Sequence, residues 1–311
     1  MKSYKGVFEE IAKEVSRVIV GQEDVIEQVM ITLLCDGHAL LEGYPGLAKT
    51  LLVRTMADIM ELKFSRIQNT PDLMPSDITG TYIIEEQSGK RIFRFHPGPV
   101  FANMLLADEI NRATPRTQSA LLEAMQERQV TVGSQTFPLD PPFFVLATQN
   151  PIEQEGTYPL PEAQADRFLL KINVAYPSYK EELEIVDKYA FQLSKPRLKV
   201  VLNKQKLFAL QDLTRQVPIA KDIKEGAIKL VTLTRTRKDL LDYGASPRAS
   251  IGLILSAKAR ALINGRKFVS IEDIRAMAPP ILRHRVIMGF EAERKGMKVD
   301  DAIAKIVSEM K

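Results

Sequence analysis

A loop containing glycine, proline and a Lys-Thr pair is the feature of this sequence that most clearly predicts chemistry. The segment Glu42–Thr50 reads Glu-Gly-Tyr-Pro-Gly-Leu-Ala-Lys-Thr and stands between an apolar run, His38–Leu41, and an amphipathic run, Leu51–Ala57. A strand, a loop of this kind and a helix form a cradle in which loop N–H groups and the helix N-terminus face a bound phosphate. The residues expected to surround the phosphates of a nucleotide are Gly43, Pro45, Gly46, Leu47, Ala48, Lys49, Thr50 and Leu51.

Two side chains of this loop have predicted roles of their own. Lys49 would reach the β- and γ-phosphates, and the Thr50 hydroxyl would hold Mg²⁺. The consensus motif has glycine where this chain has Ala48, and alanine fits there only with a negative φ, as in the first turn of a helix. An ordinary connection between a strand and a helix is the alternative interpretation.

An acidic pair follows a second apolar run. Asp108 and Glu109 come directly after Met104–Ala107, which we expect to be a buried strand. Open α/β sheets bind ligands at the carboxyl ends of their strands. Asp108 would hold the Mg²⁺, and Glu109 would orient and deprotonate an attacking water. The alternative is that the pair only caps a strand or begins a helix.

An amide and two arginines could complete such a site. Asn150 follows the apolar run Phe143–Thr148, where it could hydrogen-bond a γ-phosphate or the water, although Asn-Pro is also a turn signal. Arg167 precedes the last predicted strand, and Arg248 lies near the start of a helix. Arginine stabilises the charge on a transferring phosphoryl group. Taken alone, each arginine is better interpreted as a residue of a surface salt bridge.

The first half of the chain alternates strand-like and helix-like segments, which predicts an α/β fold with a parallel sheet. Two segments with β character interrupt the alternation: 81–95, with a turn at Ser88-Gly89, and 129–139, with a turn at Gly133-Ser134. Both are expected to be hairpins inserted into the framework. Strands are expected at 38–41, 64–67, 104–107, 143–148 and 168–172, and helices at 7–18, 22–34 and from Thr114-Pro115 onward.

Beyond Tyr176 the pattern becomes helical. Apolar residues recur at helical spacing over 207–217, 225–235 and 248–264. Ser270–Asp273 reads as a capping box that opens another helix, which is expected to end at Pro279-Pro280. The sequence therefore predicts an α/β domain at 1–176 and a smaller helical domain at 177–311.

Composition excludes several classes of protein. Of the 311 residues, 45% are hydrophobic and 26% charged, and the net charge of +4 is too small to argue for nucleic acid. The apolar runs are too short to span a bilayer and the N-terminus lacks a signal-peptide core, so we expect a cytoplasmic protein. The single cysteine, Cys35, excludes an internal disulfide. Cys35 with His38 could be half of a metal site, but only two other histidines remain, so both residues are expected to be structural.

Taken together, these motifs resemble the AAA+ ATPases, and specifically the MoxR family. The resemblance runs from residue 17 to 285. It rests on the motifs at Gly43–Thr50, Leu105–Ala113, Ala147–Pro151, Ala165–Phe168 and Ser246–Ala249. It implies a P-loop AAA+ core with a parallel sheet and inserted β-hairpins, followed by a smaller, all-helical lid domain. The MoxR family resembles this chain at Ala48 as well, since its motif reads Gly-x-Pro-Gly-x-Ala-Lys-Thr.

The resemblance also implies site residues and an assembly. Asn150 would be the first sensor, Arg248 a second sensor from the lid, and Arg167 the arginine finger that reaches a neighbouring subunit, with Arg112 and Arg116 as alternatives. The segment Val20-Gly21-Gln22 would line the adenine pocket. The implied protein is an ATP- and Mg²⁺-dependent chaperone ATPase that works as a ring, expected to be a hexamer. Hydrolysis would rock the lid against the core and remodel a partner protein, such as one carrying a von Willebrand factor A domain.

Two other functions are alternatives to a chaperone ATPase. A DNA-associated motor or loader would use Lys90, Arg91 and Arg94 on the first hairpin to contact phosphates, but we expect a solvated hairpin and no nucleic acid. Phe93 and Phe95 are expected to be core residues rather than platforms for bases. A nucleotide-gated binding switch with little turnover would not need Glu109. We therefore expect an ATPase that hydrolyses the β–γ phosphoanhydride.

Overall fold

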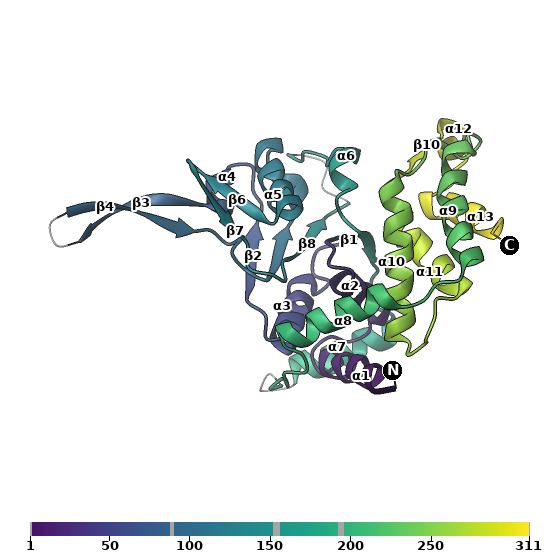
Figure 1. Cartoon of the computed structure of the whole chain (residues 1–311), viewed down its shortest axis with the longest axis horizontal. Coiled ribbons are helices and arrows are strands. Elements are labelled where there is room, and N and C mark those ends of the chain that lie inside the picture. Colours follow the sequence, from purple (N-terminus) through teal and green to yellow (C-terminus); the bar gives the residue numbers. More distant parts are fainter. Residues whose placement is uncertain (1, 88–89, 152–155, 192–195, 311) are drawn as a thin grey trace.

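A five-stranded parallel sheet forms the centre of the N-terminal half (Figure 1). The computed structural model describes residues 2–87, 90–151, 156–191 and 196–310. The strand order is β2-β5-β8-β1-β9, and every neighbouring pair is parallel. Each predicted strand is present within two residues of its expected bounds. The strands are β1 (Ala39–Gly43), β2 (Phe64–Gln68), β5 (Met104–Asp108), β8 (Phe144–Gln149) and β9 (Leu170–Val174).

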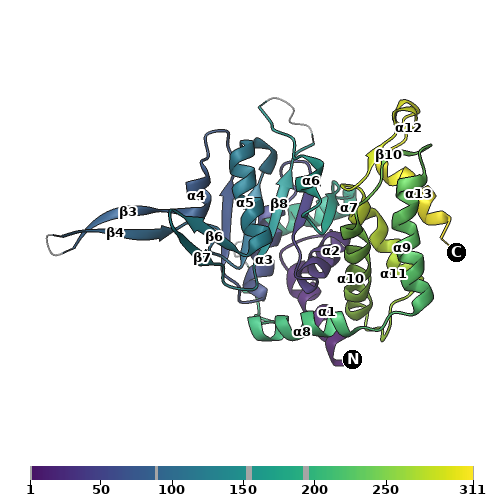
Figure 2. The ribbon, with the colours of Figure 1, turned by 45° about the horizontal axis from the view of Figure 1, so that its top comes forward.

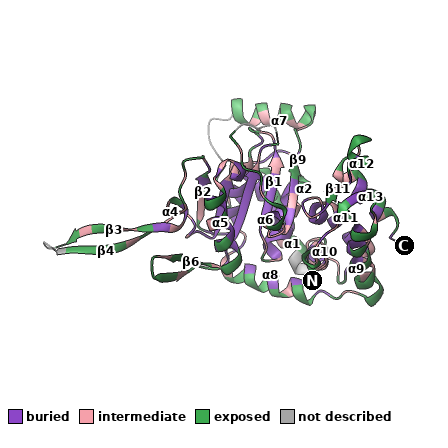
Figure 3. Cartoon of the chain, turned by 90° about the horizontal axis from the view of Figure 1, so that it is seen from above, coloured by how far each residue is buried: buried purple, intermediate pink, exposed green. Residues whose placement is uncertain are grey.

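Helices cover both faces of this sheet because successive strand residues point to opposite sides. Leu41, Leu106 and Leu146 pack in one cluster with α1 (Lys2–Ser16), α2 (Glu23–Leu34) and α3 (Lys49–Ile59). Their neighbours in the strands, among them Leu40, Leu105 and Val145, pack in a second cluster with α5 (Pro115–Glu127). Figure 3 shows these strands buried in the middle of the molecule. The predicted N-terminal residue of α5, Pro115, occupies the first helical position after Thr114.

Both predicted insertions are antiparallel hairpins. The short helix α4 (Pro75–Thr79) leads into β3 (Gly80–Gln87) and β4 (Lys90–Pro97), which project away from the body (Figures 1 and 3). The predicted turn at Ser88-Gly89 lies outside the described residues. The second hairpin, β6 (Gln129–Val132) and β7 (Gln135–Pro138), turns at Gly133 with a φ of 64°.

Aromatic rings join the two hairpins at the base of the first. Phe95 stacks on Phe137 with ring centroids 4.1 Å apart, and Phe101 packs edge-on against both rings. Phe93 and Phe95 are both expected in the core: Phe95 is instead half-buried among these rings, and the expectation is wrong for Phe93, which is 74% exposed. Phe93 lies two residues nearer the tip, beyond the reach of the second hairpin.

The C-terminal half is helical, as expected, with one small addition. Its helices are α7 (Tyr179–Ala190), α8 (Lys204–Gln216), α9 (Lys221–Thr236), α10 (Pro247–Ile263), α11 (Ile271–Leu282), α12 (Phe290–Arg294) and α13 (Val299–Ser308). Two short strands, β10 (Leu241–Tyr243) and β11 (Ile287–Met288), form an antiparallel ribbon that the sequence pattern did not predict. Two further short elements in the N-terminal half are a 3₁₀ turn at Ile110–Arg112 and α6 (Glu162–Ala165).

The predicted end of α11 is wrong. The capping box is present, since the Asp273 carboxylate accepts from the Ser270 N–H at 2.9 Å, but the helix continues through Pro279-Pro280 to Leu282. Each proline removes one helical hydrogen bond. Burial of Pro280, Ile281 and Leu282 in the apolar core offsets this loss.

The two halves share one core. A single apolar cluster includes Val29 of α2 and Ile172 of β9 together with Leu207 of α8 and Leu253 of α10. The Gln211 side chain of α8 also donates to the Leu33 carbonyl at 2.8 Å. Figure 2 shows α8 and α10 lying beside α1 and α2. The division at residue 176 falls in the coil between β9 and α7 and stays a prediction.

Candidate nucleotide site

The glycine-rich loop, the acidic pair and Asn150 line one cleft. Its volume is about 380 Å³, and it lies at the carboxyl ends of β1, β5 and β8, where an open sheet binds ligands. The structure thus brings together residues that are far apart in the chain. The lining residues are Pro45, Gly46, Leu47, Ala48, Lys49, Thr50, Leu51, Arg66, Asp108, Glu109 and Asn150.

Ala48 does not have the expected backbone conformation. Its φ is 54° and its ψ 21°, so it is left-handed, whereas the sequence argument required a negative φ. The residue stands just before the first residue of α3, where the chain must turn from the loop into the helix. Left-handed geometry costs a non-glycine residue about 1–2 kcal/mol. Together with Gly46, at a φ of 83°, it curls the loop into a concave row of N–H groups of the kind that binds anions.

Lys49 lies across this concavity. Its Nζ donates to the Gly43 carbonyl at 2.6 Å, which places the ammonium over the end of β1. Thr50 follows in the first turn of α3, and its side chain shares the cleft with the Asp108 carboxylate. A hydroxyl and a carboxylate are oxygen ligands of the type that Mg²⁺ prefers, so this pair fits the ion that the sequence predicts.

Thr148 fixes the two acidic residues relative to each other. Its hydroxyl donates to Asp108 Oδ1 at 2.6 Å and accepts from the Glu109 N–H at 2.8 Å. Glu109 has a left-handed backbone with a φ of 54°, which turns its side chain away from the course of β5. The Glu109 carboxylate then accepts from Gln68 Nε2 at 2.9 Å and from Arg112 at 3.1 Å.

Arg66 and Gln68 are site residues that the sequence argument missed. Both lie on β2, whose register places Gln68 opposite Asp108. Arg66 lines the cleft and donates to Asp108 Oδ2 at 2.6 Å. Their spacing of two residues puts them on the same face of a strand, but only the observed strand order shows that this strand lies beside β5.

Of the three residues predicted to line the adenine pocket, Val20 and Gln22 border a pocket next to the cleft. This apolar pocket has a volume of about 100 Å³, shares Gly46, Leu47, Ala48 and Leu51 with the cleft and is closed by side chains of α7. Gly21 lines neither the pocket nor the cleft. It has a φ of 65°, and a Cβ there would collide with the Glu181 carboxylate.

Arg167 and Arg248 lie together, but away from the cleft. Both line a separate cavity of about 170 Å³ with His38, Met125, Gln126 and Asp166. Arg248 donates to Asp166 at 3.4 Å. The apolar pocket is bordered by α7, whereas Arg248 lies on α10. Figure 3 shows α7 along one edge of the molecule, away from α10.

His38 and Cys35 have structural positions. Burial lowers the pKa of His38 to about 3, so the ring is neutral, with Nδ1 accepting from the Val145 N–H at 3.0 Å. Burial also raises the pKa of the Cys35 thiol. Across the part of the chain that the structure describes, no group of three or more His, Cys, Asp or Glu residues could hold a metal. Over the same residues, none of the helices has the length and apolar content needed to cross a membrane.

Comparisons with known proteins agree with this architecture. Residues 38–170 match the model for the ATPase family associated with various cellular activities (AAA), and residues 234–306 match the AAA lid domain. Chaperone MoxR1 of Mycobacterium tuberculosis is 48% identical over 287 residues, covering 90% of this chain and 75% of that protein. YeaC of Bacillus subtilis is 44% identical over 299 residues, covering 96% and 92%.

The fold comparison gives the same result. The crystal structure of a protein from Cytophaga hutchinsonii superposes with a TM-score of 0.92 at 44% sequence identity, covering 99% of this chain and 96% of the other. Identity at this level over nearly the whole chain, with both AAA domain models matched in order, means that the chain belongs to the MoxR family of AAA+ ATPases.

Proposed function

We propose that this protein binds ATP in the cleft and hydrolyses its β–γ phosphoanhydride. The observation that carries the proposal is the convergence of Lys49, Thr50, Asp108, Glu109 and Asn150 on one cleft from the start of a helix and the ends of two strands. A phosphate cradle, oxygen ligands for a metal, a carboxylate base and a polar amide are the parts that phosphoryl transfer to water requires.

Each residue has a proposed task in this reaction. The curled loop and Lys49 bind the β- and γ-phosphates, and Lys49 exchanges its bond with the Gly43 carbonyl for the phosphate oxygens. Mg²⁺ held by Thr50 and Asp108 would neutralise charge on the phosphates. Glu109 accepts a proton from the attacking water, and Asn150 orients that water or the γ-phosphate. The apolar pocket beside Val20 accommodates the adenine.

We further propose that active sites are completed between subunits. Arg167 and Arg248 do not line their own cleft, so the nucleotide that they contact is that of a neighbour. Contact between two different surfaces of identical subunits closes into a ring when the rotation permits. A hexameric ring is the assembly that we favour. Arg112 is less suited than Arg167 to the role of arginine finger, because it already donates to Glu109 of its own site.

The biological action that we propose is ATP-driven remodelling or maturation of a partner protein. The name of MoxR1, a chaperone, supports this class of activity, and a von Willebrand factor A domain is the partner type implied by family resemblance. The projecting hairpin β3–β4 is the surface that we assign to the partner. Its exposed Ile84 and Phe93 are paired across the two strands, which makes a small apolar contact face.

Two substitutions test the enzymatic proposal. Lys49→Ala should abolish ATP binding, because the cradle loses its fixed positive charge. Glu109→Gln should retain binding and lower kcat by roughly 10²–10⁴, the usual range for loss of a general base. Nucleotide affinity and turnover are measured separately for each variant. Wild-type turnover in Glu109→Gln would show that Glu109 is not the base.

A further inference from the structure

Three consecutive residues after α11 fasten the C-terminal helices to the segment that carries Arg167. We call Arg283-His284-Arg285 the clamp. Each of its side chains donates to a main-chain carbonyl at the start of β9 or just before it. The bonds run from Arg283 to Lys171 O at 3.1 Å, from His284 Nε2 to Phe168 O at 3.0 Å, and from Arg285 to Leu169 O at 2.9 Å.

Arg285 is the centre of the clamp. Its side chain is only 3% exposed, and its guanidinium has five N–H donors. The structure gives it five acceptors, so each donor can be satisfied. They are Asp166 Oδ1 at 2.7 Å, Asp166 O at 3.2 Å, Leu169 O at 2.9 Å, Ile281 O at 2.6 Å, and Phe168 O. Lysine could not reproduce this planar arrangement of donors.

Asp166 extends the connection to the second arginine. While Oδ1 accepts from Arg285, Oδ2 accepts from the Ser246 hydroxyl at 3.0 Å and from Arg248 at 3.4 Å. Ser246 is the N-cap of α10, so the start of this helix is held by the same carboxylate. Asp166 is also the residue directly before Arg167, so the carboxylate that binds Arg248 and Arg285 belongs to the segment that carries Arg167.

His284 supports the same segment in its neutral form. Burial, and then the charge of Arg285, hold the pKa of His284 well below its ordinary value. The ring therefore has a single N–H, which it donates to the Phe168 carbonyl. Phe168 itself is fully buried, which anchors the segment from the side of the sheet.

We propose that Arg285 is a positioning residue that joins Arg167 and Arg248 into one rigid unit, which contacts the nucleotide of the neighbouring subunit. The inference rests on the proposed function of the cleft. It also changes the expected motion, because a movement of the C-terminal helices must carry the Arg167 segment with it. A nucleotide-driven displacement at a neighbour's site would then be transmitted through Asp166 and Arg285 to α10 and α11.

The test is Arg285→Lys, which retains the charge but loses the five-donor fork. We expect kcat to fall roughly tenfold or more, as displaced catalytic groups do, with ATP affinity and ring assembly unchanged. In an Arg167→Ala, Arg248→Ala background the same substitution should have no further effect on kcat, because it acts through those arginines. Mixing Arg285→Lys subunits with Lys49→Ala subunits should restore activity, since the Lys49→Ala subunit supplies an intact unit to its neighbour.

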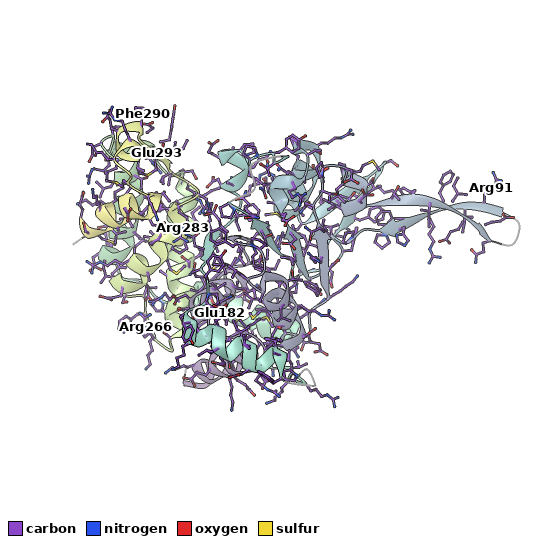
Figure 4. The ribbon with its side chains drawn as sticks, turned by 180° about the vertical axis from the view of Figure 1, so that it is seen from behind. Arg91, Glu182, Arg266, Arg283, Phe290 and Glu293 are labelled. Atoms are coloured by element: carbon purple, nitrogen blue, oxygen red, sulfur yellow. The ribbon has the colours of Figure 1, made fainter. Side chains whose placement is uncertain are left out.

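Arg266→Lys is the matched control. Arg266 also donates a fork to a buried carboxylate, that of Asp273, but within the C-terminal helices (labelled with Arg283 in Figure 4). It should lower thermal stability and leave kcat per assembled subunit unchanged. Unaltered kcat in Arg285→Lys, or an equal loss in the background that lacks both arginines, would overturn the proposal. If Arg285→Lys does not fold, Asp166→Asn replaces it with the same expectations.

Hydrogen exchange separates failure of the clamp from failure of the ATPase proposal. The Leu169 N–H donates to the His38 carbonyl at 2.7 Å and should be protected in the parent chain. Protection over residues 166–169 should fall in Arg285→Lys and persist in Arg266→Lys, whether or not ATP is hydrolysed. Unchanged protection in Arg285→Lys contradicts the clamp, while an inactive parent chain contradicts only the proposed function.

Discussion

The hydroxyl of Thr148 shows how a single atom can set the geometry of the cleft. It has one hydrogen, and because it accepts from the Glu109 N–H, that hydrogen is directed to Asp108. The proposed metal ligand and the proposed base are therefore held by the same side chain. Thr148 is fully buried, so water does not compete for these bonds.

Replacing Thr148 with valine should impair catalysis more than nucleotide binding. Valine retains the shape but leaves the Glu109 N–H without a partner, at a cost of about 1–3 kcal/mol in the free energy of unfolding. The two carboxylates lose their common anchor, so kcat should fall roughly tenfold or more. Thermal unfolding and steady-state kinetics measure the two effects.

The control for Thr148→Val is Thr214→Val. Thr214 is also fully buried and donates to a main-chain carbonyl, but in α8, away from the cleft. Its kcat should equal that of the parent chain. An equal loss of kcat in both variants would mean that loss of a buried hydroxyl, rather than its place between Asp108 and Glu109, is responsible.

Sequence alone identified those residues of the cleft whose position depends on local pattern. Lys49 and Thr50 open a helix after a glycine-rich loop, and Asp108 and Asn150 follow buried strands, so the ends of predicted elements place them. Arg66 could not be found in this way, because its role depends on β2 lying beside β5. Ala48 was assigned the wrong conformation, because local preference was overridden by the turn that the loop requires.

At the scale of elements, tertiary packing explains the errors. The two prolines near the end of α11 are strong local stop signals, but the residues around them are buried, so the helix continues. Phe93 and Phe95 of β4 are both expected to be core residues, whereas only Phe95 is covered by the second hairpin. The ribbon β10–β11 is too short to give a periodic signal.

The exposed face of the first hairpin should affect partner binding and not basal hydrolysis. Ile84→Ser with Phe93→Ser removes an exposed apolar pair, so the melting temperature and basal ATPase should change little. With ATP bound, Glu109→Gln should retain its partner proteins because it hydrolyses ATP only slowly. Adding Ile84→Ser and Phe93→Ser to Glu109→Gln should abolish this retention. Phe290→Ser is the control, because Phe290 on α12 is 70% exposed and lies away from the hairpin (Figure 4). Retention of the same proteins by the hairpin variant would contradict the assignment.

The charges of this hairpin argue against a nucleic-acid partner. Glu86 is opposite Arg91 in the register, and Glu85 forms an ion pair with Arg94 at 3.2 Å, so both arginines have an acidic neighbour. We expect no DNA binding at physiological salt. Binding of a fluorescent duplex that weakens steeply with salt, and less steeply after Arg91→Ser with Arg94→Ser, would instead favour the DNA-motor function.

At the scale of the whole molecule, the cleft and the arginine pair lie apart. We therefore expect that a complete active site needs the cleft of one subunit and the arginines of another. Arg167→Ala should leave ATP affinity nearly unchanged and reduce turnover by roughly 10³-fold or more, as for other arginine fingers. Lys49→Ala removes the cleft and leaves the arginines intact. Each variant alone has little or no turnover, but each retains the half-site that the other lacks.

Mixed rings of these two variants should therefore recover part of the wild-type activity. Recovery requires an intact cleft to meet an intact Arg167. This happens where a Lys49→Ala subunit supplies its Arg167 to the cleft of an Arg167→Ala subunit, and not at the interface formed the other way round. Turnover of the mixture is measured with light scattering to show that rings have formed. Turnover per subunit should also rise with protein concentration, since a dissociated subunit lacks the arginines of a neighbour. Absence of recovery in assembled mixed rings would place Arg167 outside the neighbour's site, and turnover per subunit independent of concentration, with no oligomer detected, would exclude the ring.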